Sequence, residues 1–261
     1  MYSMRLFILV DDKSGNICSG EHGFSVLIGE KQKILFDTGA SDLFLKNAQK
    51  LNVNLEDISH IVLSHGHWDH GNGLKFIKNK RLVLHPGSFV KRYRDRDDSY
   101  IGLPLSLEEA KINFDLVLAK EPYFIVDDIV FLGEIPRNND FEAKKTTWHK
   151  EDKEEDFVMD DSALAIKHEK GLIVIAGCSH SGICNIIEYA KEVTGLNKVY
   201  SVIGGFHLNN LDDVTNKTIE YFKKENIEKV YPSHCVSSDV VKKFIEELGA
   251  ETIRSGSILN L

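Results

Sequence analysis

The residues whose types and spacing could do chemistry are concentrated between Ser64 and Gly71, where the sequence reads Ser-His-Gly-His-Trp-Asp-His-Gly. Neutral imidazole and carboxylate groups are good ligands for Zn, Mn and Fe ions. A single histidine beside a strand is usually only a hydrogen-bonded polar residue, whereas three histidines and an aspartate within six residues predict a metal site. The candidate ligands in this stretch are His65, His67, Asp69 and His70.

The element that must position these ligands is a loop at the end of a buried strand. The apolar run 61–63 directly precedes the stretch, and the turn-forming residues 71–73 follow it. On such a loop, alternate side chains can turn toward an ion. We therefore expect His65 and His67 on one metal, and Asp69 and His70 on a second.

Three further histidines follow predicted strands in the second half of the chain: His180, His207 and His234. Apolar strands alternate there with amphipathic helices, which we expect over 183–193, 215–226 and 238–248, with a last strand over 251–254. Because each histidine comes at the same end of its strand, the three are expected to line one cleft.

The spacing His-x-His-x-Asp-His after an apolar strand resembles the metallo-β-lactamase superfamily. The resemblance implies an α/β fold, the four-layer αββα sandwich, with a mono- or dinuclear metal site at the edge of its two sheets. The final strand of that superfamily ends in Pro-x-His, which matches Pro232 to His234 here. We assign His234 to the second metal. Asp37 resembles the first motif of the superfamily and is expected to orient a histidine, although on sequence alone it could equally be a turn residue or a helix cap.

The chain departs from the superfamily pattern in two places. Asp160-Asp161-Ser162 stands where a histidine is expected, and Gly177-Cys178 stands where Gly-Asp is expected. His180, two residues beyond Cys178, is our candidate for the vacant ligand position, and Asp161 is a second. Cys178 could be a thiolate ligand or could only pack beneath the site.

Two further stretches, 176–183 and 204–208, look like one branch of this superfamily. That branch is similar to archaeal 7,8-dihydropterin-6-methyl-4-(β-D-ribofuranosyl)aminobenzene-5'-phosphate synthase, and the resemblance covers nearly the whole chain. It implies the fold and the metal site, but it implies the condensation reaction more weakly. We expect residues 1–261 to form a single domain, with an insertion at 134–160 that acts as a lid or a substrate wall.

Composition excludes several classes of partner. The net charge of −8 argues against general binding to nucleic acid or to an anionic membrane. No apolar segment is long enough to predict a membrane-spanning helix, and the apolar N-terminal run reads as a first strand rather than a signal sequence. The four cysteines form no Cys-x-x-Cys pair and the sequence predicts no secretion signal, so we expect a cytoplasmic protein. The expected partner is a small-molecule substrate.

The leading hypothesis is a metal-dependent hydrolase that uses one or two Zn ions, with Mn or Fe as alternatives, to activate a water. Asp69 would orient the water and accept its proton, and His207 would bind or protonate the leaving group. The expected substrate is a small phosphorylated or ester-like metabolite. From the basic run 91–96, Arg92 and Arg94 are weaker candidates for binding a phosphate.

Two other functions stay open. The first is a condensing transferase like the synthase, which would join a pterin-like pyrophosphate to an arylamine phosphate. The second is a metal-holding sensor that binds a small molecule with little turnover. A product that forms only when the arylamine is present would indicate the transferase. Tight binding without turnover would indicate the sensor.

Overall fold

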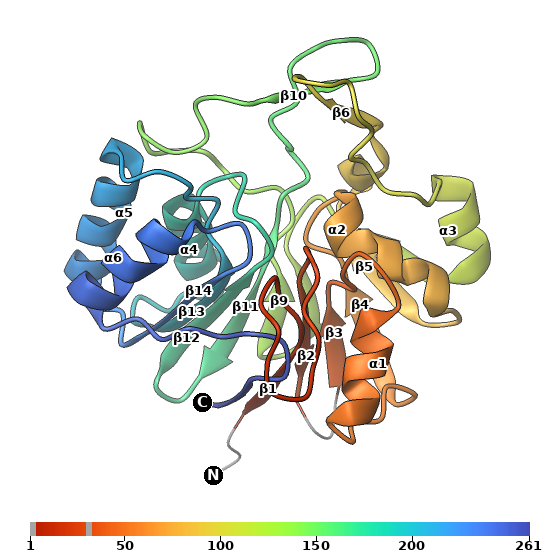
Figure 1. Ribbon diagram of the computed structural model, residues 1–261, viewed down its shortest axis with the longest axis horizontal. Coiled ribbons are helices and arrows are strands. Elements are labelled where there is room, and N and C mark those ends of the chain that lie inside the picture. Colours follow the sequence, from red (N-terminus) through yellow and green to blue (C-terminus); the bar gives the residue numbers. More distant parts are fainter. Residues whose placement is uncertain (1–3, 30–32) are drawn as a thin grey trace. The chain divides into compact units, whose positions relative to one another are not determined.

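The computed structural model describes residues 4–29 and 33–261 (Figure 1). Contacts within the chain divide it into two compact units. Unit 1 runs to Ala119 and also takes in His149–Glu154 and Ile253–Leu261, and unit 2 consists of Lys120–Trp148 and Glu155–Thr252. The expectation of one domain with an insertion at 134–160 stays a prediction.

Unit 1 is built on a seven-stranded sheet with the order β15-β1-β2-β3-β4-β5-β7. Strands β3, β4, β5 and β7 are parallel to one another, so the loops that follow them start from the same edge of the sheet. The strands are β1 (Arg5–Val10), β2 (Ser25–Ile28), β3 (Lys33–Phe36), β4 (Ile58–Val62), β5 (Arg81–Leu84), β7 (Asp115–Leu118) and β15 (Ile258–Asn260).

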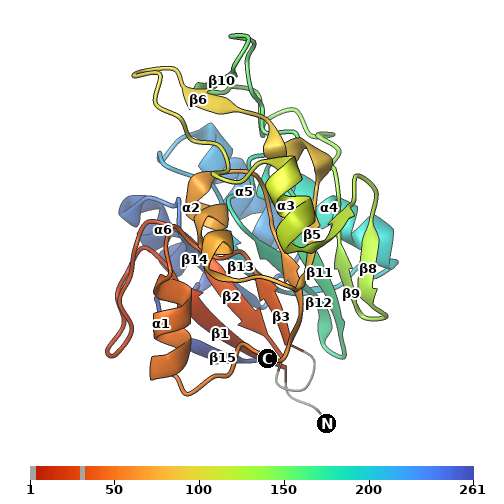
Figure 2. The same cartoon turned by 90° about the vertical axis from the view of Figure 1, so that its right-hand side faces the viewer.

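One face of this sheet packs against helical segments. Helix α1 (Leu43–Lys50) buries Phe44 and Ala48, which join alternate strand residues in a hydrophobic cluster that includes Leu35 and Ile61. Figure 2 shows α1 beside β1. The other helical segments of the unit are α2 (Trp68–Gly71), α3 (Leu107–Asn113) and the 3₁₀ turns Asn72–Phe76 and Pro86–Phe89. Ser106 and Glu109 form a capping box at the start of α3.

Unit 2 contains a six-stranded sheet with the order β14-β13-β12-β11-β9-β8. Strands β12, β13 and β14 are parallel, and β11 and β12 form an antiparallel hairpin. The parallel strands therefore deliver three loops to one edge of the sheet. The strands are β8 (Tyr123–Val126), β9 (Ile129–Phe131), β11 (Ala163–His168), β12 (Gly171–Ala176), β13 (Val199–Gly205) and β14 (Lys229–Ser233).

Three helices cover one face of this second sheet: α4 (Ile183–Thr194), α5 (Asp213–Lys224) and α6 (Ser238–Leu248) (Figure 1). Their apolar faces meet every second residue of the strands, so Ile187 and Phe222 share a core with Val174 and Val202. Each fully buried apolar side chain of this kind stabilises a fold by about 1.5–3 kcal/mol. Asp212 and Ser237 cap α5 and α6 with side-chain hydrogen bonds.

A small two-stranded sheet pairs β6 (Arg92–Arg94) with β10 (Trp148–Lys150). Within unit 1, the ring of His149 stacks on Tyr93 and forms contacts of 2.8 Å with both Asp95 and Asp98. Among the described residues, none of the helices combines the length and the apolar character needed to cross a membrane.

The expected last strand over 251–254 is wrong. That segment is irregular, and a turn closed by a hydrogen bond from Ser257 N to Arg254 O follows it. Backbone hydrogen bonds to Ile8 of β1 begin at Gly256, and the strand ladder begins at Ile258, which lies opposite Phe7. The physical reason is that residues 251–254 lead from the end of unit 2 into unit 1 and reach their strand partner after the turn.

Candidate metal centre

The ligand-rich loop follows β4 in unit 1, as the sequence predicted. His67 has an extended backbone and precedes α2, so Asp69 and His70 lie within the first helical turn. A side chain at Gly66 would collide with the backbone of Ser88, so only glycine allows the loop to pass there. The local sequence therefore combines an extended segment that carries two histidines with a short helix that carries the aspartate and the third.

A buried carboxylate beneath the loop fixes the protonation of two of these rings. Asp37 accepts hydrogen bonds of 2.7 Å from the backbone N–H of Ser64, from the Ser64 hydroxyl and from Nδ1 of His70. Because a carboxylate only accepts, His70 must carry its proton on Nδ1. The Ser64 hydroxyl has already donated to Asp37, so it accepts from Nδ1 of His65 at 2.9 Å. In both His65 and His70 the lone pair is therefore on Nε2.

The three imidazoles of the loop lie against one another. Nε2 of His65 is 3.0 Å from Nδ1 of His67, and the rings of His65 and His70 have centroids 4.3 Å apart. Oδ2 of Asp69 is 3.8 Å from Nε2 of His70. Ring nitrogens with fixed lone pairs beside a carboxylate are the donor set of a borderline cation such as Zn. The residues of the loop therefore fit the metal that the sequence predicted.

In unit 2, the loops after the three parallel strands have strained backbones. Ser179, His207 and Cys235 have φ values of 60°, 50° and 47°, and they follow β12, β13 and β14 respectively. Left-handed conformations of this kind cost non-glycine residues about 1–3 kcal/mol and cluster at functional sites. The Ser179 hydroxyl donates to the carbonyl of Gly205 at 2.6 Å, which connects the first loop to the end of β13.

Asp161 supports the loop that carries His180. Its carboxylate accepts from the backbone N–H and the hydroxyl of Ser181. Burial raises the pKa of Asp161 to about 6, against the lowering effect of these hydrogen bonds and of Arg137. Through these hydrogen bonds, Asp161 holds the loop that follows β12 in place.

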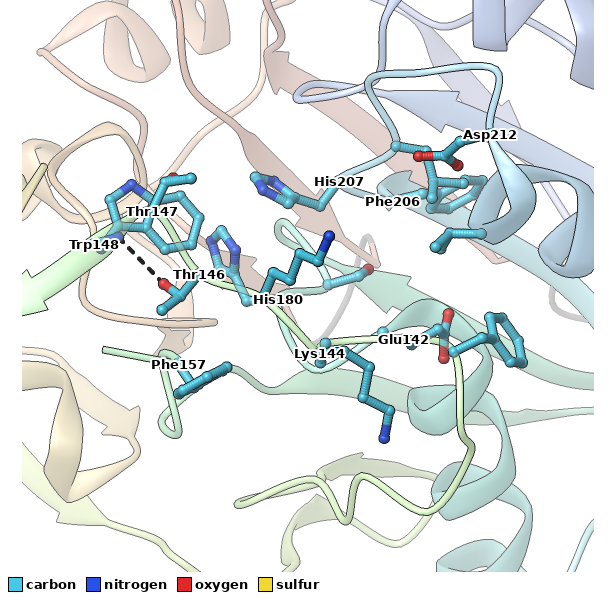
Figure 3. A pocket seen from close by; sticks show the side chains of 17 residues that line it. Glu142, Lys144, Thr146, Thr147, Trp148, Phe157, His180, Phe206, His207 and Asp212 are labelled. Carbon is cyan, nitrogen blue, oxygen red and sulfur yellow. Dashed lines mark hydrogen bonds between the residues drawn. The ribbon is translucent and has the colours of Figure 1, made fainter. Parts of the chain in front are cut away.

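A pocket of about 350 Å³ opens beside His180 and His207 within unit 2 (Figure 3). The two rings are 4.6 Å apart, and the indole of Trp148 lies 4.9 Å from His180 and 5.4 Å from His207. Burial acts to lower the pKa of His207, but a hydrogen bond to Cys235 raises it above its usual value. Among the other residues that line the pocket are Lys144, Lys145, Phe157 and Phe206.

The segment expected as an insertion is fastened to the start of α4. The buried carboxylate of Glu142 accepts from the backbone N–H groups of Cys184 and Asn185 at 2.9 Å, which places a negative charge at the positive end of the helix. The Asn185 side chain in turn accepts from the backbone of Asn138 and Asn139. Burial raises the pKa of Glu142 against these hydrogen bonds. The pocket wall thus has a fixed attachment.

The structure places the predicted residues in two groups. Unit 1 holds Asp37 and the loop ligands, and also Arg92 and Arg94. Arg92 is only 1% exposed and donates to the carbonyl of Gly87, whereas Arg94 is partly exposed and lies 3.8 Å from Asp97. Unit 2 holds the remaining candidates, which are Asp161, Cys178, His180, His207 and His234.

The sequence did not predict the roles of two residues. One contacts a predicted site residue, and the other contacts the start of α4, directly after the loop that carries His180. Nε2 of His22 is 3.3 Å from Oδ2 of Asp69, although His22 lies in a polar loop far away in the sequence. Glu142 showed no motif, and only its place within the charged insertion could have drawn attention to it. Its glycine partner Gly182 has a φ of 94°, and any side chain there would collide with Glu142.

Comparison with known proteins decides the family. The family model described as the metallo-beta-lactamase superfamily matches residues 19–193, which include the whole ligand loop. The chain belongs to the metallo-β-lactamase superfamily. The predicted fold class, an α/β fold of the metallo-β-lactamase type, is confirmed by this match and by the solved structure described next.

Members of the superfamily that resemble this chain cover nearly all of it. The crystal structure of Tm1679, a metal-dependent hydrolase of the beta-lactamase superfamily, matches with 33% identity, a TM-score of 0.89 and coverage of 99% of both chains. The 7,8-dihydropterin-6-methyl-4-(beta-D-ribofuranosyl)-aminobenzene-5'-phosphate synthase of Methanocaldococcus jannaschii is 34% identical over 98% of this chain and 96% of its own length. An uncharacterized protein of the same organism is 36% identical over 90% and 92%. The predicted resemblance to the synthase branch is confirmed.

Proposed function

We propose that the chain is a metal-dependent hydrolase that acts on a small phosphorylated or ester-like metabolite. The observation that carries the proposal is the cluster of three histidines in unit 1, in which Asp37 and Ser64 fix the lone pairs of His65 and His70 on Nε2. Such an arrangement orients imidazoles for a cation rather than for a purely structural role.

The proposed ligands are residues of both units. The assignment of the loop residues and of His234 follows the superfamily pattern, whereas His180 is our candidate for the position at which the chain departs from that pattern, with Asp161 as the second candidate. His65, His67 and His180 would hold one ion, and Asp69, His70 and His234 would hold a second. Imidazole and carboxylate ligands suit Zn, with Mn or Fe as alternatives. When bound, such an ion acts as a Lewis acid and lowers the pKa of its bound water to about 7.

The other proposed roles belong to side chains of this chain. Asp69 would orient the attacking water and accept its proton, and the contact with His22 would help to hold its carboxylate in place. His207 lines the pocket and would donate a hydrogen bond or a proton to the leaving group. Arg92 and Arg94 stay our candidates for a substrate phosphate, and the partly exposed Arg94 is the more accessible of the two.

A second candidate function is the condensing reaction of the synthase relative. Two observations favour it: the identity of 34% over 98% of the chain, and the aromatic side chains that line the pocket in unit 2. Trp148, Phe157 and Phe206 would suit a flat ring system. In this reaction the arylamine phosphate instead of water would displace pyrophosphate from the pterin, so that the pterin group is bonded to the arylamine, pyrophosphate leaves, and the amine loses a proton.

Turnover by the Zn-loaded protein separates these functions. The protein is incubated with a pterin pyrophosphate, with and without the arylamine ribose phosphate, and with a panel of phosphodiesters, thioesters and lactones. The hydrolase predicts turnover of at least one panel compound without any amine. Product that forms only with the arylamine would identify the transferase instead. Tight binding of a panel compound without turnover of any would indicate a sensor and contradict the proposal.

A further inference from the structure

The thiol of Cys178 lies close to two of the proposed metal ligands of unit 2. Its Sγ is within 4.8 Å of a ring nitrogen of His180 and also within 4.8 Å of a ring nitrogen of His234. All three side chains are buried, with exposed fractions of 3%, 8% and 3%. A buried cysteine usually serves only as a small apolar group. Here, however, its sulfur is close to two imidazoles of the kind that bind metals.

The fold explains how residues from two separated strands come so close. Cys178 follows β12 and His234 follows β14, and β13 lies between them in the sheet. Strands two positions apart are separated by about 9.5 Å. Strand β13 ends in Gly204 and Gly205. A side chain at Gly204 would collide with the last residue of β12, and one at Gly205 would collide with the loops that follow β12 and β14. The absence of side chains at this end of β13 thus allows groups from its two neighbours to approach across it.

The neighbouring thiol has a different environment. Sγ of Cys235 lies 3.7 Å from the carbonyl oxygen of Cys178, to which it donates, and Cys235 also forms a hydrogen bond with His207. Its sulfur is therefore directed at the backbone and at the imidazole of the pocket. Cys235 provides a matched control, because it is a cysteine of the same unit and directly follows His234 in the sequence.

We propose that Cys178 binds metal as a thiolate and is shared between the ion held by His180 and the ion held by His234. This inference rests on the metal site of the proposed function and goes further, because it names a sulfur ligand. On binding, the S–H bond breaks and its proton is released to water, a metal–sulfur bond forms, and no group is oxidised. A thiolate is a soft ligand, so the site should favour Zn, Co and Cd over Mn and Mg.

Absorption spectroscopy of the full chain loaded with Co(II) tests the proposal. Visible d–d bands report that cobalt is bound, and a near-ultraviolet sulfur-to-cobalt charge-transfer band reports that a thiolate is among its ligands. The chain is compared with the variants Cys178→Ser, Cys178→Asp and Cys235→Ala, each checked for folding by circular dichroism. Cys178→Asp supplies a carboxylate at the same position, so it remains informative if the serine variant does not fold.

We expect the charge-transfer band in the wild type and in Cys235→Ala, and its loss in the Cys178 variants, with the d–d bands of Cys178→Asp retained. A band that persists without Cys178, or d–d bands without any charge-transfer band in the wild type, would overturn the role of Cys178 and leave the metal site standing. A wild-type chain that binds no cobalt would overturn both this inference and the proposed function.

Discussion

Replacing Asp37 by asparagine would disturb the metal loop while the volume of the side chain stays nearly the same. The carboxylate of Asp37 accepts three hydrogen bonds, two from Ser64 and one from Nδ1 of His70. An asparagine has one oxygen that accepts and one nitrogen that donates. If its oxygen faces the backbone N–H of Ser64, its amide nitrogen faces His70. His70 must then accept on Nδ1 and carry its proton on Nε2, the nitrogen that lies beside Asp69.

The expected loss of Zn affinity follows from the changed tautomer of His70. A protonated Nε2 cannot bind a metal, so the variant must either shift the tautomer back or lose a ligand. Changes to groups that orient metal-binding histidines typically lower metal affinity about 10- to 100-fold, equivalent to about 1.4–2.7 kcal/mol. We therefore expect Asp37→Asn to raise the dissociation constant for Zn by a factor in this range while the chain stays folded.

Competition with a fluorescent Zn chelator measures this dissociation constant. The matched control is Asp11→Asn, because Asp11 is also a buried carboxylate of unit 1 and accepts from the backbone N–H of Lys13. The control should bind Zn about as tightly as the wild type. A folded Asp37→Asn variant with the affinity of the control would show that Asp37 does not set the tautomer of His70, and the reasoning would fail.

Further predictions concern stability. Because burial raises the pKa of Glu142 above its usual value of 4.5, its contribution to stability is present below that value and is lost as the pH rises through the higher pKa of the folded chain. Urea titrations between acid and neutral pH should therefore show the stability advantage of the wild type over Glu142→Gln shrinking as the pH rises, and an advantage that grows would contradict the argument. Gly182→Ala should lower the free energy of unfolding by about 1–3 kcal/mol, and by more than Gly195→Ala, because both glycines have positive φ but only Gly182 would collide with a neighbour. Equal losses in the two variants would show that the contact with Glu142 does not limit this position.

Much of the fold could be predicted because the local signals are strong. The ligand loop, for example, lies between an apolar run and a pair of glycines, and it does begin directly after the buried strand β4. Helices α4, α5 and α6 have apolar residues at helical spacing, and they lie within a few residues of the expected ranges. These elements depend on neighbours that are close in the sequence, so a pattern of adjacent residues is enough to find them.

The parts that were missed depend on partners far away in the sequence. The contact of His22 with Asp69 joins two loops, and neither loop carries a motif for the other. Glu142 becomes important only when the insertion folds back on the first turn of α4. The last strand was expected too early because the turn before it is set by where β1 lies, and not by local apolar residues.

Metal content tests the central claim most directly. The wild type, His180→Ala and the control His168→Ala are purified without chelator and analysed by elemental mass spectrometry, with folding checked by circular dichroism. His168 stacks on Tyr200 and is not among the proposed ligands. We predict one or two equivalents of a Zn-like ion per chain in the wild type and in the control, and about one fewer in His180→Ala. A folded wild-type chain that retains no metal, and takes up none when Zn, Mn or Fe is added, would contradict the account.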